Sequence, residues 1–429
     1  MKVLWIIHDV LEPFFPYVKG KPAKGGSWIE PLFFSLSNHP EIKLGVITPI
    51  TDGEFIKKKI ANIEYYSVPI KKGDNIIELN SSNVRSYLKA ITDFNPTIIH
   101  IHGTEKNFGL LREYVSEEIP IVCSIQGIIN SYEPHLHLSS SFINYKKYKS
   151  LKNWLGMGGI DFLKKWWRKY KLIEKKIFTI NRYFIGRTLW DKSQTAALNP
   201  EALYFHGEEL LRPPFYKTKW NVDTCEKHSI FISSGAYPIK GLHVLLEAVN
   251  ILKLKHKNLK IYIPLFNTPK RSFLRDKLIG EDYTIYINNI ISKYGLQSNV
   301  VFLNRLNAED MALQFSKSNV FVLPSFIENS PNSLGEAMSI GVPSVVSYSG
   351  GVGSMVRDED SALFFPIGDY RTLAFQIDRL FTEENLSNKL SANAKIIAGR
   401  RHNIKETTKQ YIEIYKEIIR IHNEDFSQK

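Results

Sequence analysis

Phe321-Val-Leu-Pro-Ser-Phe-Ile-Glu-Asn-Ser-Pro-Asn-Ser-Leu-Gly-Glu-Ala-Met-Ser-Ile-Gly-Val-Pro-Ser-Val-Val-Ser347 restricts the fold of this chain more than any other stretch. Residues 319–323 predict a buried strand, the loop formers after them predict a turn, and residues 333–340 predict a helix ended by Gly341. The next strand is predicted at 342–347. In open α/β sheets, ligands bind where a loop joins a strand to a helix, because the helix amino terminus favours anions. The pattern therefore predicts an anion site.

Two glutamates lie in this stretch, and the residues alone leave two interpretations of each. Ser333-x-x-Glu336 has the spacing of a capping box, in which both side chains bond to the backbone at a helix start. Glu328 lies in a polar loop, where a carboxylate is commonly only solvated. The alternative for both is contact with a ligand in the predicted site.

Composition indicates a globular protein with more than one domain. A chain of 429 residues fits two domains of about 200 residues each. No window has the roughly 18 apolar residues needed to cross a bilayer, and residues 1–9 predict a first strand rather than an export signal. With only Cys123 and Cys225, a disulfide framework is not expected, and we expect a cytoplasmic protein.

Predicted strands alternate with helices along the whole chain, which is typical of parallel sheets with crossover helices. The segment 212–223 contains a proline pair and polar residues, and we place a domain boundary there, giving domains 1–212 and 213–403. A last helix is predicted near 404–421, with an apolar face that needs a surface to cover. The strands are predicted at 3–7, 44–48, 97–102, 119–125 and 183–186, then at 229–233, 259–264, 300–303, 320–323 and 342–347.

Three further sites carry residues suited to chemistry. Lys240 follows a predicted strand and directly precedes a helix, so its charge adds to that of the helix amino terminus. Gly25 and Gly26 lie in an early loop and would let the backbone approach a phosphate closely, although a plain turn is the commoner reason for such a pair. His100 and His102 end a strand with both side chains on one face, but no further ligand with metal-site spacing is visible.

The stretch at 321–347 resembles the carboxyl-terminal signature of retaining glycosyltransferases with the GT-B fold, glycosyltransferase family 4, also called glycosyl transferases group 1. Two glutamates separated by seven residues, Glu-Ala-Met, Gly-Val-Pro and a glycine pair make up that signature. The matching positions are Pro324, Ser325, Glu328, Glu336, Ala337, Met338, Gly341, Val342, Pro343, Gly350 and Gly351.

The resemblance implies two facing Rossmann-like domains, with a terminal helix at 404–424 crossing back to the first domain and the active site in the interdomain cleft. It further implies that Glu328 meets the donor sugar and Glu336 the ribose. Lys240 then binds the diphosphate, and the Gly25 and Gly26 loop covers it. We complete the donor site with Asn332, Ser333 and Leu334 at the start of the helix.

The acceptor side implied by the resemblance departs from the family at two points. His102 matches a histidine that borders the acceptor cleft, whereas Gln126 replaces a histidine found in many relatives and cannot titrate. An arginine that usually accompanies the phosphate-binding lysine is missing, since Gly235 and Ala236 occupy that region. Arg187, just after a strand, is a candidate for the missing cation and for the acceptor side.

The function expected from the resemblance is retaining transfer of a hexose-type sugar from a nucleotide diphosphate sugar to a hydroxyl acceptor. We nominate Glu328, Lys240 and His102 as catalytic, and expect neither a cofactor nor a metal. Asp358-Glu-Asp360 is interpreted as a turn. The alternatives are a nucleotide-sugar epimerase of the same fold and a non-catalytic protein that binds sugar nucleotides or a membrane surface.

A basic and aromatic segment spans 145–176, where eleven Lys or Arg residues stand against only Asp161 and Glu174. Cations mixed with tryptophans suit an anionic membrane surface. The alternatives are aromatics packed in the core beneath a solvated basic face, and nucleic-acid binding, which no recognised motif supports. We expect no nucleic-acid partner, a saccharide or lipid-linked acceptor such as a surface polysaccharide precursor, and a protein that is peripheral on the inner face of the membrane.

Overall fold

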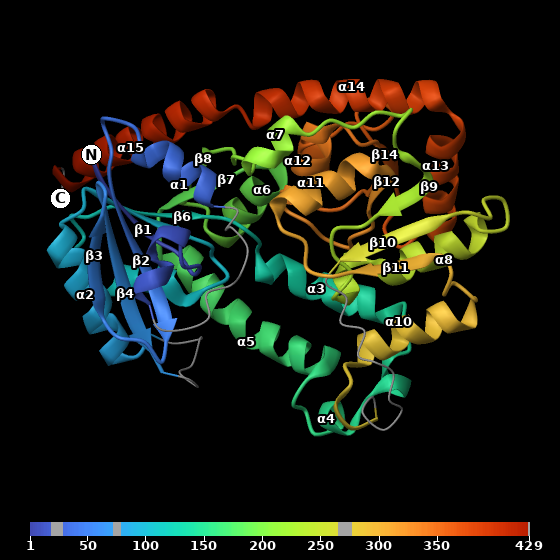
Figure 1. Ribbon diagram of the computed structural model, residues 1–429. Helices are drawn as coiled ribbons and strands as arrows, with labels where there is room; N and C mark the ends of the chain where they lie inside the picture. Colours follow the sequence, from blue (N-terminus) through green and yellow to red (C-terminus); the bar gives the residue numbers. More distant parts are fainter. Residues whose placement is uncertain (19–28, 72–78, 265–276, 428–429) are drawn as a thin grey trace. The chain divides into compact units, whose positions relative to one another are not determined.

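The computed structural model describes residues 1–18, 29–71, 79–264 and 277–427, and these form two compact units (Figure 1). Unit 1 comprises Met1–Asn130, Lys169–Arg212 and Arg401–Lys429, and unit 2 comprises Ser131–Arg168 and Pro213–Arg400. The chain passes between the units at Arg212 and Pro213, where the sequence placed the linker.

The segment 131–168 departs from the predicted division, which assigned it to the first domain. It groups with unit 2 because three of its apolar side chains enter the core of that unit and because its backbone is bonded there. The N–H groups of Gly159 and Ile160 donate to the carboxylates of Glu281 and Asp282 at 2.9 and 3.0 Å. Neither contact has a signal in the local sequence. The buried side chains are Ile143, Tyr145 and Ile160.

The sheet of unit 1 has the strand order β3-β4-β2-β1-β5-β6-β7-β8 among the described residues. All neighbours are parallel except β3 and β4, which form an antiparallel edge. The prediction omitted β3, β4 and β8. The outer strand β3 reads Ile-Lys-Lys-Lys-Ile and is mostly exposed, so no buried apolar run marked it. The bounds are β1 (Lys2–Ile6), β2 (Lys43–Thr51), β3 (Ile56–Ile60), β4 (Ile63–Ile70), β5 (Ile98–His102), β6 (Ile121–Ser124), β7 (Tyr183–Gly186) and β8 (Leu203–His206).

Helix α15 (Ile404–Ser427) packs on the sheet of unit 1, as expected for the last helix. The hydroxyl of its buried Tyr415 accepts from Nε1 of Trp5 at 3.1 Å and lies 2.7 Å from Nδ1 of His100. Burial lowers the pKa of His100 to about 3, so this imidazole is neutral. The other helical elements that begin in unit 1 are η1 (Glu12–Tyr17), α1 (Glu30–Ser37), α2 (Ser81–Phe94), η2 (Asn107–Glu113), α3 (Ile129–Ser141) and α6 (Leu189–Leu198).

Helices α3 and α5 (Gly159–Ile180) both cross the boundary between the units, and a buried carboxylate joins them inside unit 1. Glu174 of α5 accepts from the backbone N–H groups of Ile129 and Asn130 at 2.9 and 2.7 Å. Burial raises the pKa of Glu174 to about 7, although these hydrogen bonds oppose the rise. The first turn of α3 is thereby fixed to α5.

The sheet of unit 2 has the order β11-β10-β9-β12-β13-β14, and all its pairs are parallel. Counted from the first strand, this is the order 3-2-1-4-5-6 of a dinucleotide-binding sheet, which reverses between β9 and β12. The three-residue strand β14 was not predicted. The bounds are β9 (Glu226–Phe231), β10 (Lys260–Pro264), β11 (Val300–Leu303), β12 (Ser318–Leu323), β13 (Ser344–Ser347) and β14 (Leu363–Phe365).

Helices of unit 2 pack on this sheet through an aliphatic core. Leu242, Leu245, Leu246 and Val249 are fully buried on α8, at the helical spacing that the sequence showed. The helical elements are η3 (Tyr145–Tyr148), α4 (Leu151–Trp154), α7 (Pro213–Lys217), η4 (Pro238–Lys240), α8 (Leu242–Leu252), α10 (Asp282–Lys293), α11 (Ala308–Lys317), α12 (Asn332–Ile340), η5 (Val352–Ser354), α13 (Tyr370–Thr382) and α14 (Glu384–Arg401).

Both cysteines are buried free thiols. Burial raises the pKa of Cys123 to about 12 and also raises that of Cys225. Among the described helices, none combines the length and the apolar character needed to cross a bilayer.

Candidate functional site

The site in unit 2 forms where loops from neighbouring parallel strands converge. Strands β9 and β12 are paired, with Phe231 beside Phe321, so their following loops emerge at the same edge of the sheet. The order of strands reverses between these two, and such a switch point leaves a crevice for ligands. The first loop carries Lys240 and the second carries Glu328.

Lys240 and Glu328 form an ion pair at this point. Nζ of Lys240 lies 2.6 Å from Oε1 of Glu328, and the hydroxyl of Ser325 donates to the same oxygen at 2.7 Å. The Glu328 side chain is 8% exposed and that of Lys240 is 29% exposed. Glu328 is therefore not a merely solvated loop carboxylate, and the lysine keeps a face open to a ligand.

Two glycines allow the backbone around this pair to pack closely. Gly241, directly after Lys240, has φ of 70°, and a side chain there would collide with the carbonyl oxygen of Pro324. Gly350, after β13, has φ of 50°, and a side chain there would collide with the carbonyl oxygen of Glu328. Only glycine tolerates both the positive φ and the contact at these positions. The N–H of Gly351 donates to the Glu328 carbonyl at 2.9 Å, so the loop after β13 also contributes to the site.

Helix α12 starts one residue earlier than the sequence indicated, which removes the capping box predicted for Glu336. Its N-cap is Pro331, without a side-chain cap, so Ser333 lies inside the first turn and the proposed capping box is absent. Glu336 is nevertheless buried, at 5% exposed. Asn332 and Ser333 are half-buried at the amino end of the helix, whereas the Leu334 side chain is fully buried.

The three residues that the sequence nominated for the acceptor side lie together in unit 1. His102 ends β5, Gln126 follows β6 and Arg187 follows β7, and these strands are neighbours in the sheet. The three side chains line one small pocket together with Glu209 and Tyr411. Parallel order again explains the convergence, because the carboxyl ends of the strands share one edge.

Arg187 is held by unit 1 itself. Its guanidinium forms an ion pair with Glu209 and donates to the carbonyl of Ile125 at 2.8 Å and to Oε1 of Gln126 at 3.1 Å. Burial lowers the pKa of Arg187. Glu209 was not predicted as part of this group, and its only sequence signal is its position as an acidic residue after the last strand of this sheet.

His102 is buried against aromatic rings, with its ring centroid 4.1 Å from Trp5 and 3.8 Å from His100. Burial, His100 and Arg187 all lower the pKa of His102 well below its ordinary value. Its buried Nε2 has no hydrogen-bond partner among the described residues. The imidazole is therefore neutral.

The glycine pair and the acidic triplet at 358–360 were also predicted from the sequence. Gly25 and Gly26 lie outside the described residues. Asp358, Glu359 and Asp360 form a turn: Asp358 accepts from the N–H of Phe364, and Glu359 pairs with Arg379. Among the described residues, no group of three or more His, Cys, Asp or Glu side chains is placed to hold a metal ion.

Residues 216–396 match the sequence model of the family Glycosyl transferases group 1. Unit 2 contains a group 1 glycosyl transferase domain. The matched range of this group 1 domain includes Lys240, Ser325, Glu328 and Glu336.

Curated relatives match this chain over part of their length. The putative glycosyltransferase YtcC of Bacillus subtilis is 25% identical over 215 residues, covering 49% of this chain and 50% of the relative. A D-inositol 3-phosphate glycosyltransferase of Nocardioides is 25% identical over 187 residues, covering 42% and 39%. The capsular polysaccharide biosynthesis glycosyltransferase CapM of Staphylococcus aureus is 25% identical over 157 residues, covering 36% and 37%. The chain thus spans about half the length of the first of these relatives and less of the others.

Solved structures match almost the whole chain in fold. Sucrose-phosphate synthase from Thermosynechococcus elongatus has a TM-score of 0.73 at 15% identity and covers 98% of this chain and 100% of its own. Anabaena HepE in complex with UDP-glucose has a TM-score of 0.65 at 14% identity, covering 97% and 100%. The fold of this chain, which contains the group 1 domain, is the GT-B fold, with two Rossmann-like α/β units.

Proposed function

We propose that this protein is a retaining glycosyltransferase that moves a hexose-type sugar from a nucleotide diphosphate sugar to a hydroxyl of an acceptor. The observation that carries the proposal is the ion pair of Lys240 and Glu328 at the switch point of unit 2. A cation for a phosphate and a carboxylate for sugar hydroxyls stand side by side there. These are the two polar groups that such a donor requires.

The donor is proposed to lie across the loops after β9 and β12. Lys240 and the amino ends of α8 and α12 favour the diphosphate, because unpaired N–H groups and the helix dipole attract anions. Glu328 is assigned to the sugar, and Glu336 to the ribose hydroxyls. Asn332, Ser333 and Leu334 contribute at the first turn of α12, where Leu334 offers only its backbone because its side chain is buried. Gly25 and Gly26 are proposed to approach the diphosphate through their backbone.

The chemical step is proposed to proceed on the front face of the sugar. Departure of the diphosphate builds negative charge that Lys240 stabilises, while positive charge develops at the anomeric carbon near Glu328. The leaving phosphate oxygen takes the proton of the acceptor hydroxyl, so the proposal assigns no nucleophile, cofactor or metal to the protein. His102, as a neutral imidazole, and Gln126 are assigned to hydrogen bonds with the acceptor, and Arg187 to positioning Gln126.

Support for the donor and acceptor classes comes from the names of similar proteins. HepE is described in complex with UDP-glucose, and a trehalose-6-phosphate protein of Escherichia coli is described with UDP-2-fluoro glucose bound. CapM belongs to capsular polysaccharide biosynthesis, and WaaG is a glycosyltransferase involved in lipopolysaccharide biosynthesis. We therefore propose a UDP-hexose as the first donor to test. For the acceptor we propose a saccharide or lipid-linked precursor of a surface polysaccharide, used by a cytoplasmic enzyme on the inner face of the membrane.

A donor screen tests this proposal. Thermal shifts with UDP-, GDP- and ADP-glucose identify the nucleotide, and product analysis with donor alone separates slow hydrolysis from epimerisation. An epimerised donor would establish the alternative enzyme of the same fold. Binding without turnover, with or without a lipid-linked acceptor extract, would establish the non-catalytic alternative. Turnover that disappears in Lys240→Ala and Glu328→Ala supports the transferase, whereas full activity of both variants contradicts the site.

A further inference from the structure

Large apolar side chains gather on the surface of unit 2 at one place. Around α4, Trp154 is 73% exposed, Leu155 64% and Met157 59%. Exposed apolar residues also come from a second, distant segment of the chain. We call the whole set the apolar tip: Leu151, Trp154, Leu155, Met157, Leu278 and Ile279.

Contacts beside these residues join the two segments of the tip. Nδ2 of Asn153 donates to the carbonyl of Gly280 at 3.2 Å, and Nζ of Lys152 lies 2.6 Å from Glu281. Leu278 and Ile279 directly precede Gly280, so their exposed side chains lie next to the α4 turn. The tip is therefore one surface feature made from two parts of the sequence.

The tip has an ordered support beneath it. Asn153 itself is buried, and the hydroxyl of Ser150 accepts from its N–H at 3.3 Å, capping α4. The N–H groups of Gly159 and Ile160 end on the carboxylates of Glu281 and Asp282. Because polar contacts fix the base while the apolar side chains point outward, the exposure is built into the fold. Contiguous exposed apolar surface of this kind marks a site of interaction.

Basic side chains flank the tip in the sequence. Lys146, Lys147 and Lys165 are exposed, and Nζ of Lys149 lies 5.5 Å from the ring of Trp154. The acidic neighbours already have partners, since Asp161 pairs with Lys149 and Glu281 with Lys152. Tryptophan favours the boundary between water and lipid, and lysine favours anionic headgroups. This combination suits an anionic bilayer better than a protein partner.

We propose that the apolar tip is a membrane-docking element, which inserts Trp154, Leu155 and Met157 among the headgroups of an anionic bilayer while lysines of the flanking segments contact lipid phosphates. It rests on and deepens the proposed function, because it supplies the surface on which a lipid-linked acceptor would be met. In Figure 1, α4 lies at the edge of unit 2, beyond α10 from the sheet.

The element differs from the one that the sequence suggested. Trp166 and Trp167, an adjacent pair on α5, are both half-buried. Trp154 is instead the most exposed tryptophan among the described residues. Leu278 and Ile279 had no sequence signal connecting them to this segment. Docking is thus assigned to the turn at 151–157 rather than to the length of 145–176.

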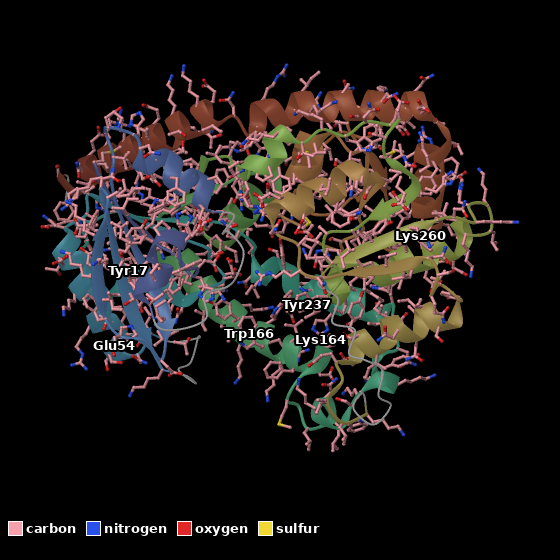
Figure 2. All side chains as sticks on the ribbon, viewed as in Figure 1. Tyr17, Glu54, Lys164, Trp166, Tyr237 and Lys260 are labelled. Carbon is pink, nitrogen blue, oxygen red and sulfur yellow. The ribbon has the colours of Figure 1, made fainter. Side chains whose placement is uncertain are left out.

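A cavity lies between the tip and the loop that leads to Lys240. It has a volume of about 420 Å³ and is lined by Met157 of the tip, Phe162 of α5 and Tyr237 of the loop that leads to Lys240. Figure 2 labels Tyr237, which lines this cavity, and Lys164 of α5, which directly follows the lining residue Leu163. Docking at the tip would therefore bring lipid next to the loop that carries the phosphate-binding lysine.

Vesicle flotation with the full chain tests the proposal. We expect binding to vesicles of phosphatidylglycerol and phosphatidylcholine that falls at least tenfold at high salt, on vesicles of phosphatidylcholine alone, and in the triple variant Trp154→Ser/Leu155→Ser/Met157→Ser. The matched control is Leu254→Ser, because Leu254 is 78% exposed in the same unit but lies in another segment. Circular dichroism and the melting temperature establish that the variants are folded.

A measurement of insertion depth distinguishes docking from nonspecific adsorption to vesicles. Bimane on Leu155→Cys should shift to the blue and be quenched by spin-labelled lipid, whereas bimane on Leu254→Cys should do neither. Unchanged vesicle binding by the triple variant would overturn the proposal, because the tip would then have no role in docking. A wild-type protein that self-associates and does not bind vesicles, and that the triple substitution makes monomeric, would overturn it in favour of a second copy of the chain as the partner of the tip.

Donor hydrolysis, measured on the same variants, separates this proposal from the proposed function. Loss of vesicle binding with hydrolysis retained supports both. Tip-dependent vesicle binding by a protein without any donor turnover would contradict the proposed function and leave the docking element standing.

Discussion

Nζ of Lys240 lies 2.6 Å from Oε1 of Glu328, although 88 residues separate them in the sequence. The two parallel strands that precede these residues are neighbours, so their loops share one edge of the sheet. Without a donor, the carboxylate balances the lysine charge in a partly buried place. Each residue of the pair is therefore expected to matter to the electrostatics of the other as well as to a ligand.

Lys240→Ala is expected to lower kcat by about 10²- to 10³-fold, the usual loss when one group that stabilises developing negative charge is removed. Lys257→Ala, which removes an exposed lysine of the same unit, should leave kcat unchanged. Steady-state kinetics with the donor found in the screen provide the measurement. An equal effect of the two substitutions would show that Lys240 has no specific role.

Gly241→Ala is expected to destabilise unit 2 and to weaken donor binding, because its side chain would meet the Pro324 carbonyl at a positive φ. Gly295→Ala separates the two causes, since Gly295 also has a positive φ, 60°, but open space around it. We expect about 1 kcal/mol of destabilisation at Gly295 from the backbone conformation alone. Chemical denaturation measures the loss in the free energy of unfolding for each variant. A larger loss for Gly241→Ala than for Gly295→Ala would be due to the collision with Pro324, whereas equal losses would contradict close packing at the site.

Glu336→Gln is expected to raise the KM for the donor about 10- to 100-fold, since hydrogen bonds to a charged group contribute about 1.5–3 kcal/mol. The melting temperature should change little, because glutamine keeps the size of this buried side chain. Glu309→Gln, on the exposed first turn of α11, serves as the control. A lower melting temperature with an unchanged KM would assign Glu336 a purely structural role.

The stability of unit 1 is expected to depend on pH through Glu174, whose pKa in the folded protein is raised from 4.5 to about 7 by burial. Between these two values the unfolded chain loses the proton while the folded chain keeps it, so stability falls as pH rises and levels off above about 7. The loss is about 3 kcal/mol, at about 1.4 kcal/mol for each pKa difference of one.

Denaturation of the wild type and of Glu174→Gln at pH 4.5, 6 and 7.5 measures this dependence. Glutamine cannot accept all the N–H groups that Glu174 accepts, so the variant should be less stable at pH 4.5, and the difference should shrink by pH 7.5. A difference that stays constant over this range would mean that Glu174 is ionised in the folded protein throughout.

His102 is expected to act without changing its charge, because burial holds its pKa well below the ordinary value. His102→Gln should therefore lower kcat/KM for the acceptor without altering the shape of the profile between pH 5.5 and 8. Loss of an inflection near pH 6.5 in the variant would show instead that His102 titrates during turnover.

The sequence was sufficient to predict that Lys240 and Glu328 lie close together, because the features that position them are local. Lys240 follows one strand and Glu328 another, and parallel order brings such loops to one edge without further information. The hydrogen bond from Ser325 and the partner of Arg187, Glu209, depend on side-chain directions that spacing does not specify.

Tertiary contacts explain what could not be predicted. Residues 131–168 join unit 2 because Glu281 and Asp282, more than a hundred residues away, bind the start of α5. The edge strand β3 is stabilised by pairing with β4, although its three lysines show no buried face. Because α12 begins at Asn332, Ser333 is not its N-cap, and the capping box predicted from the spacing of Ser333 and Glu336 does not form.

The two native thiols are hidden in the interior and held in their protonated form, so alkylating reagents should react with neither in the intact protein. A cysteine introduced at any exposed position would then be the one reactive handle on an otherwise unaltered chain. Probes for fluorescence or spin resonance can thus be attached site by site without replacing the buried Cys123 and Cys225.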